Sequence, residues 1–117
     1  MKSRLFLFWN IGKNVYKKQK YFENIYEKYS IYCSYLFGMS DFFTRENIRY
    51  MKRFYCVFPI YYDSLSRLSW EHYKLLLKVY DREDLYFYYN VALFCNSSML
   101  ELKYLINNNY FKIIKER

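Results

Sequence analysis

Four basic side chains recur at helical spacing in the segment FTRENIRYMKRFYCVFP, which spans residues 43–59. They are Arg45, Arg49, Lys52 and Arg53. On a helix, at about 100° per residue, they share one side, broadly opposite Ile48, Met51, Tyr55 and Phe58. Lys and Arg grouped in this way bind phosphates through charge-assisted hydrogen bonds. The segment is therefore a candidate nucleic-acid-binding helix, and charge alone leaves open the alternative of a solvated basic face.

Residues with the spacing of a catalytic or metal site are harder to find. His72 is the single His; the nearby Ser69 is read as a helix cap rather than a nucleophile, and no His or Cys partner lies at ligand spacing. Its place near the start of a predicted helix favours a structural hydrogen bond. With two glycines in all, the chain has no glycine-rich phosphate loop. We predict no catalytic residues, no bound metal and no cofactor.

Composition indicates one domain with a basic field. The chain has 117 residues, of which 54% are hydrophobic, and this is enough for one core and short for two domains. A formal net charge of +8 favours phosphate backbones or acidic partners. A membrane-spanning helix needs about 18 consecutive apolar residues, and no stretch of the chain approaches this length. No signal-peptide cleavage site follows the apolar run that ends at Asn10. We expect a cytoplasmic protein with no membrane partner.

Three cysteines, Cys33, Cys56 and Cys95, are odd in number, widely spaced and set among apolar neighbours. This pattern favours reduced core thiols over disulfides or a zinc site.

Hydrophobic periodicity predicts an all-α fold of about six helices in one compact domain, residues 1–117. The expected helices begin near Leu5, span 22–37, 43–59 and 82–94, and follow the caps Ser69 and Ser98. Gly12 falls on the apolar face of the first helix, where it would let another helix approach closely.

The predicted inner faces of two helices are broad. The second is expected to bury Ile25, Tyr29, Tyr32, Cys33, Leu36 and Phe37, with Gly38 as its C-terminal cap. The fourth is expected to bury Trp70, Tyr73, Leu76, Leu77 and Tyr80.

The second and third helices, joined by residues 39–43, are predicted to form a helix-turn-helix-like unit. In such units the second helix presents its N-terminal half to the major groove, which would place Asn47 near the groove. Residues 60–68 are irregular, and the pattern leaves a loop and a short strand, or wing, both open.

Four stretches, taken in order, resemble the N-terminal domain of the YhcG-like family of predicted PD-(D/E)XK nucleases. They are FWNIG at 8–12, LFG at 36–38, FTRENIRYMKRFYCVFP at 43–59 and LSWEHYKLLL at 68–77. The last two are the most specific, because family members typically read close to GFSRRNL, MRQFY, FP and LSWSHY with a following LL. The resemblance implies a helical, helix-turn-helix-like DNA-binding module, which in the family precedes a separate nuclease domain.

The match to the family pattern is uneven. Family positions are occupied by Arg45, Asn47, Met51, Phe54, Tyr55, Phe58, Pro59, Ser69, Trp70, His72 and Tyr73. Where the family reads close to WSVREL, this chain has Ser97 for Trp and Leu100 for Arg, and Leu85 replaces another common Arg. Each lost Arg removes a charge-assisted phosphate contact. MSDF at 39–42 resembles a small insertion in the turn.

The nuclease chemistry implied by the resemblance is not expected in this chain. Residues 101–103 have the terminal ExK letters, but they lie in a predicted capped helix, and no preceding Pro-Asp pair on a strand is visible. We therefore expect the chain not to be an enzyme.

Three functional hypotheses remain open. The first is a module that binds duplex or branched DNA through Arg45, Asn47, Arg49, Lys52 and Arg53. The second is an interaction domain that docks a separate nuclease subunit, or a second copy as a homodimer, through a surface of Trp70, His72 and Tyr73. The third is an inactive truncated remnant of such a nuclease.

Overall fold

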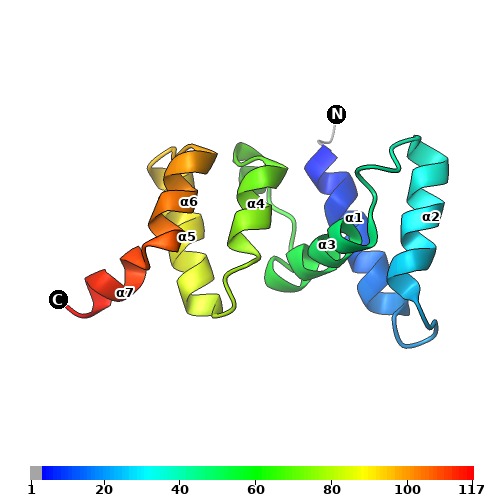
Figure 1. Ribbon diagram of the computed structural model, residues 1–117, viewed down its shortest axis with the longest axis horizontal. Coiled ribbons are helices and arrows are strands. Elements are labelled where there is room, and N and C mark those ends of the chain that lie inside the picture. The colour runs from blue at the N-terminus through cyan, green and yellow to red at the C-terminus, as the bar shows by residue number, and fades with distance from the viewer. Residues whose placement is uncertain (1–3) are drawn as a thin grey trace. The chain divides into compact units, whose positions relative to one another are not determined.

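The computed structural model describes residues 4–117, and these residues form seven α-helices and one short 3-10 helix, η1, without a strand (Figure 1). In chain order they are α1 (Arg4–Lys18), α2 (Ile25–Phe37), α3 (Arg45–Val57), η1 (Asp63–Arg67), α4 (Trp70–Leu76), α5 (Arg82–Phe94), α6 (Met99–Asn107) and α7 (Tyr110–Lys115). The predicted all-α class is confirmed. The additional helix, α7, lies in the C-terminal segment, where the sequence pattern predicted no helix.

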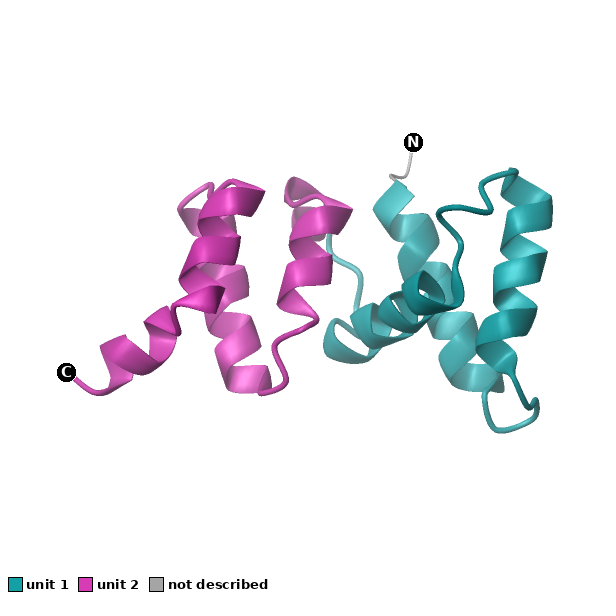
Figure 2. Ribbon diagram, viewed as in Figure 1, with its two compact units in different colours: residues 1–62 teal, residues 63–117 magenta. Residues whose placement is uncertain are grey.

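The chain divides into two compact units, unit 1 (Met1–Tyr62) and unit 2 (Asp63–Arg117) (Figure 2). Unit 1 contains α1, α2 and α3, whereas unit 2 contains η1 and α4 to α7. The sequence showed no linker at this boundary, and the single domain stays a prediction.

Unit 1 is held together mainly by the packing of α1 on α3. Gly12 makes this approach possible, because a Cβ at this position would lie 1.9 Å from the carbonyl oxygen of Met51. The core around this crossing includes Phe8, Val15 and Phe54, all buried. The close helix approach predicted from Gly12 is therefore confirmed.

Unit 2 is a bundle in which α6 packs against α4, α5 and α7. Its most buried side chains include Leu76, Leu85 and Leu102, none of which has measurable exposure. The Tyr73 hydroxyl donates a buried 2.5 Å hydrogen bond to the carbonyl oxygen of Leu65, which joins α4 to η1. This bond satisfies a polar group that would otherwise be costly to bury.

Most helix termini follow the predicted local chemistry, although α2 begins at Ile25 rather than at Phe22. The Thr44 side chain caps α3, Gly38 ends α2 with a φ of 68°, and α5 has its predicted bounds. Both Ser69 and Ser98 form reciprocal capping boxes at the starts of α4 and α6.

Residues 60–68, for which the sequence left a loop and a short strand both open, hold η1, and Leu65 from this segment enters the core. Two sequence expectations are corrected. Helix α4 ends at Leu76, so Tyr80 lies beyond it and is 94% exposed instead of buried. Cys95 is exposed rather than in the core, although all three cysteines are free thiols and Cys33 is buried as expected.

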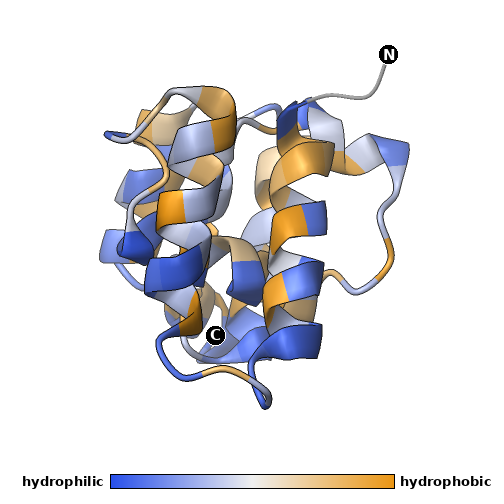
Figure 3. Cartoon of the chain, turned by 90° about the vertical axis from the view of Figure 1, so that its right-hand side faces the viewer, coloured by the Kyte–Doolittle hydropathy of each residue, from blue (hydrophilic) through white to orange (hydrophobic). Residues whose placement is uncertain are grey.

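Helix α2 buries much less than predicted. Only Ile25 and Cys33 are buried, whereas Tyr32, Leu36 and Phe37 are 58%, 51% and 42% exposed. Apolar positions are accordingly visible along the side of the molecule that α1 and α2 present in Figure 3. The apolar arc of α2 is wider than the surface that α1 and α3 cover.

Within residues 4–117, no helix has both the length and the apolar character needed to cross a membrane. The same residues contain no cluster of three or more His, Cys, Asp or Glu side chains arranged to hold a metal ion.

Candidate nucleic-acid interface

Two hydrogen bonds stabilise the turn at the start of the basic helix α3. The Thr44 side chain accepts a hydrogen bond from the backbone N–H of Asn47 at 3.2 Å. The Asn47 side-chain amide in turn donates to the carbonyl oxygen of Phe42 at 2.7 Å. Asn47 is therefore engaged in shaping the turn, and its amide nitrogen points back along the chain rather than standing free for a base.

The inner face of α3 anchors the helix in unit 1. Ile48, Met51 and Phe58 are buried, as the period of the apolar residues predicted, whereas Tyr55 is half-buried. Phe54 is buried with them. At the end of the helix, the indole N–H of Trp9 donates a buried 2.7 Å hydrogen bond to the carbonyl oxygen of Phe58. This bond satisfies a carbonyl that the helix itself leaves unpaired. The outer side chains are thus presented from a rigid base.

On the outer face, Arg45 and Arg49 are exposed, whereas Lys52 and Arg53 are half-buried. Tyr26 of α2 holds two of these side chains. The Arg49 guanidinium lies 5.0 Å from the centre of the Tyr26 ring, a cation–π distance. The Lys52 ammonium donates to the Tyr26 hydroxyl at 3.2 Å. The structure therefore brings Arg49 and Lys52 together on one aromatic side chain.

Sequence reasoning did not find Tyr26, because its part in the site depends on the contact between α2 and α3. The only available signal was its position one residue after the buried Ile25, which turns it toward the flank of the apolar face.

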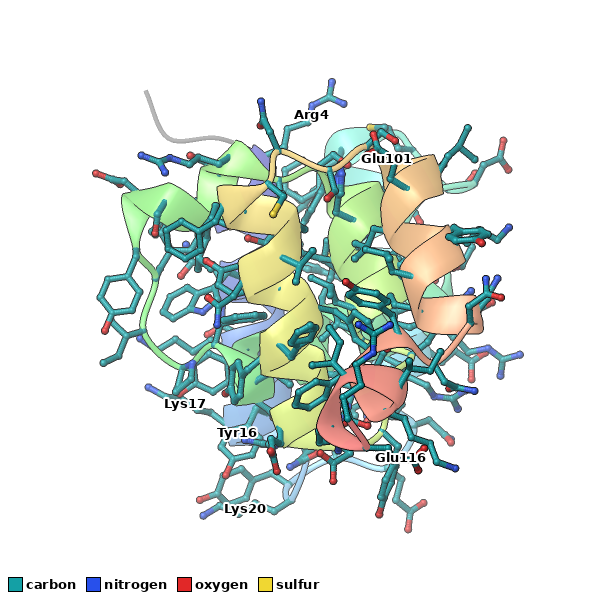
Figure 4. The ribbon with its side chains drawn as sticks, turned by 90° about the vertical axis from the view of Figure 1, so that its left-hand side faces the viewer. Arg4, Tyr16, Lys17, Lys20, Glu101 and Glu116 are labelled. Atoms are coloured by element: carbon teal, nitrogen blue, oxygen red, sulfur yellow. The ribbon has the colours of Figure 1, made fainter. Side chains whose placement is uncertain are left out.

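Electrostatically, the two units differ. Unit 1 has eleven Lys and Arg against four Asp and Glu, a net charge of +7, whereas unit 2 has eight against seven, a net charge of +1. The last turn of α1 contributes Lys17 and Lys18, and Lys20 follows in the turn after the helix; Figure 4 labels Lys17 and Lys20 near Tyr16. Nearly all of the charge excess is thus on the unit that contains α3.

The connection between α2 and α3 is longer than a standard helix-turn-helix turn. Seven residues, 38–44, separate the two helices, compared with the three or four that are common in the motif. The Ser30 hydroxyl donates to the carbonyl oxygen of Phe43 at 2.5 Å and ties this connection to α2. The arrangement is therefore α2, a seven-residue loop that is hydrogen-bonded to α2, and the basic helix α3.

Two of the three residues predicted to form a docking surface, Trp70 and Tyr73, are buried. Tyr73 is fully buried and Trp70 is 8% exposed, so both belong to the interior of the structure. Their place on the apolar face of α4 explains this burial, and the predicted docking surface is corrected accordingly.

His72, the third member of that group, makes its hydrogen bonds within unit 2. The Ser69 N–H donates to its Nδ1 at 3.3 Å, and Nε2 lies 3.0 Å from the carbonyl oxygen of Ser97. The neutral tautomer protonated at Nε2 satisfies both contacts. His72 thus joins the cap of α4 to the residues before α6, which agrees with the structural role expected of it.

Comparison with known proteins adds one match. The family model described as the DUF1016 N-terminal domain matches residues 2–113, nearly the whole chain. No curated protein and no solved structure matches the chain.

Proposed function

Because the chain belongs to the DUF1016 N-terminal domain family, the family of YhcG-like N-terminal domains, we propose that it binds the phosphate backbone of DNA through the outer face of α3. In this proposal, unit 1 supplies the binding surface and the chain performs no catalysis. Duplex and branched DNA are the proposed ligands.

The charge distribution supports this proposal. A unit with a net charge of +7 attracts a polyanion and releases its counterions on binding. Unit 2, with a net charge of +1, offers no comparable field. A charge excess that only kept the protein soluble would have no reason to be concentrated in this way.

The strongest support for phosphate binding is the contact of Arg49 and Lys52 with Tyr26. Stacking on Tyr26 restricts the Arg49 side chain, so less conformational entropy is lost when its N–H donors engage a phosphate. Lys52 uses one of its three donors on the Tyr26 hydroxyl and keeps two. Arg45, which is exposed and lies one turn before Arg49, forms a row with Arg49 and Lys52 that can follow successive phosphates.

We assign Asn47 to the turn rather than to base reading, because its side-chain amide already donates to Phe42. Arg53 is retained as a secondary phosphate contact at the edge of the row. Binding by phosphate contacts alone predicts little discrimination among DNA sequences.

The test is a titration of fluorescently labelled duplex, branched and single-stranded DNA over a range of salt concentrations. The double variant Arg45→Ala, Arg49→Ala should weaken duplex binding at low salt and lower the salt slope by about 2, since each lost phosphate contact lowers it by about 1.

The matched control is Arg82→Ala, Lys103→Ala, which removes two exposed positive charges from unit 2. It should leave the slope within error of the wild type. Equal slopes for the two double variants would contradict the assignment of the site to α3.

A further inference from the structure

An apolar groove runs between α1 and α2 in unit 1, with a volume of about 520 Å³. Its inner part is formed by Ile11, Ile25 and Cys33, all buried. Its outer wall is formed by Tyr32 and Leu36 of α2, which are 58% and 51% exposed. Large apolar side chains that line a concave surface and remain open to water are typical of a docking site.

The groove is not explained by the proposed phosphate site. Among its lining residues, Lys18 and Lys28 are the charged ones, and apolar and aromatic side chains make up most of the rest. A phosphate backbone would gain little from an apolar lining, whereas an apolar segment would bury it. The two surfaces therefore require different ligands.

Charge complementarity specifies the occupant. Lys28 lies over the Phe22 ring at 4.8 Å, so one positive charge is held directly beside an apolar wall. Lys18 supplies a second from α1. Both charged lining residues are positive and unit 1 carries +7, so a second copy of the unit would be repelled.

We propose that this groove binds an amphipathic helix of a partner protein, whose apolar face enters the groove and whose flanking acidic residues meet Lys18 and Lys28. The helix-in-groove mode needs apolar anchors at positions i, i+3, i+4 and i+7 of the partner. The acidic flanks orient the helix and exclude basic segments. This interaction is independent of DNA binding by α3.

The experiment uses the full chain and a fluorescently labelled synthetic helix with Leu at i, i+3, i+4 and i+7 and Glu at the flanks. Leu36→Asp should weaken its binding by about tenfold or more, because it places a charge against the apolar face. Ile31→Asp is the matched control, since Ile31 is 66% exposed on the same helix and does not line the groove. It should change the affinity by less than about twofold.

A second pair of measurements tests the charge complementarity. A probe with Lys in place of its Glu residues should bind at least about fivefold more weakly than the acidic probe. The charge reversal Lys28→Glu should reduce or invert that preference. Thermal unfolding curves identify any variant that has lost its fold, and Lys28→Glu then tests the groove without an apolar substitution.

Equal binding by the Leu36→Asp and Ile31→Asp variants, or equal binding of acidic and basic probes, would overturn the proposal. So would light scattering that showed a wild-type dimer abolished by Leu36→Asp, because the occupant would then be a second copy.

Discussion

Gly12 lies where α1 crosses α3, and the backbone of α3 occupies the space that a side chain would need. A Cβ on Gly12 would meet the carbonyl oxygen and carbon of Met51 at 1.9 and 2.4 Å. These are backbone atoms, so relief requires the two helices to move apart rather than one side chain to rotate.

Gly12→Ala should therefore lower the free energy of unfolding by about 3 kcal/mol, at the upper end for overpacking. Urea denaturation of the full chain measures this. The control is Gly38→Ala, where φ is +68° but no atom lies within 4 Å of the added Cβ, so only the left-handed conformation costs about 1 kcal/mol. Equal losses for the two variants would show that the crossing is not as close as described.

Cys33 is the residue with the most strongly perturbed thiol. Burial raises the pKa of Cys33 from 9.0 to about 11, because the charged thiolate is poorly solvated inside unit 1. Between these pH values the unfolded thiol loses its proton while the folded one keeps it. The stability that depends on the neutral thiol is therefore complete below pH 9 and is lost as the pH rises through 11.

Raising the pH from 8 to 10 should then destabilise the wild type by about 1 kcal/mol more than a Cys33→Ala variant. The difference between the two proteins is the informative quantity, since the tyrosines titrate in both. Chemical denaturation at the two pH values provides it, and parallel losses would mean that the Cys33 thiol is not responsible.

At the scale of elements, local sequence signals account for where most helices begin, but the apolar pattern does not account for where all of them end. Ser69 and Ser98 cap α4 and α6 as their sequences predict, because the bonds join residues only three apart. Helix α4 stops at Leu76, before the end of its apolar pattern, and Tyr80 is left in solvent. Periodicity alone cannot detect such an early end.

The His72 cap yields a prediction at this scale. His72→Ala removes both the reciprocal bond to Ser69 and the link to Ser97, and should cost about 1–2 kcal/mol of stability. His72→Gln keeps an acceptor at the third position of a capping box, so its loss should be intermediate.

Denaturation of the wild type, His72→Gln and His72→Ala should give stabilities that decrease in this order. The DNA salt slopes of the two variants should equal that of the wild type. A changed slope would instead place His72 in the binding surface. A Gln variant no more stable than the Ala variant would show that the Ser97 link provides the whole effect.

At the scale of the whole molecule, charge and apolar surface are both distributed unevenly. Unit 1 holds most of the net positive charge and also the open groove between α1 and α2. Its two surfaces are chemically distinct, since the row on α3 consists of cations and the groove mainly of apolar side chains. Unit 1 thus concentrates the chemistry suited to a polyanion and to an amphipathic helix.

The inner residues of α3 were predictable from sequence, and the state of its outer residues was not. Ile48, Met51 and Phe54 follow the helical period, and that period depends only on backbone geometry. The engagement of Asn47 with Phe42, and of Arg49 with Tyr26, depends on a loop and on a neighbouring helix. The family resemblance, carried by ordered motifs, could be recognised without either.

The sequence by itself determined the all-α class, most helix starts, the close approach at Gly12 and the excess of positive charge. These properties are local or additive, so they need no knowledge of neighbours. Only the tertiary structure decided that Tyr73 is core, that Tyr26 holds Arg49 and Lys52, and that α2 leaves a groove beside α1. The physical reason is that an apolar period reports which face can be buried, whereas coverage of that face depends on where other helices lie.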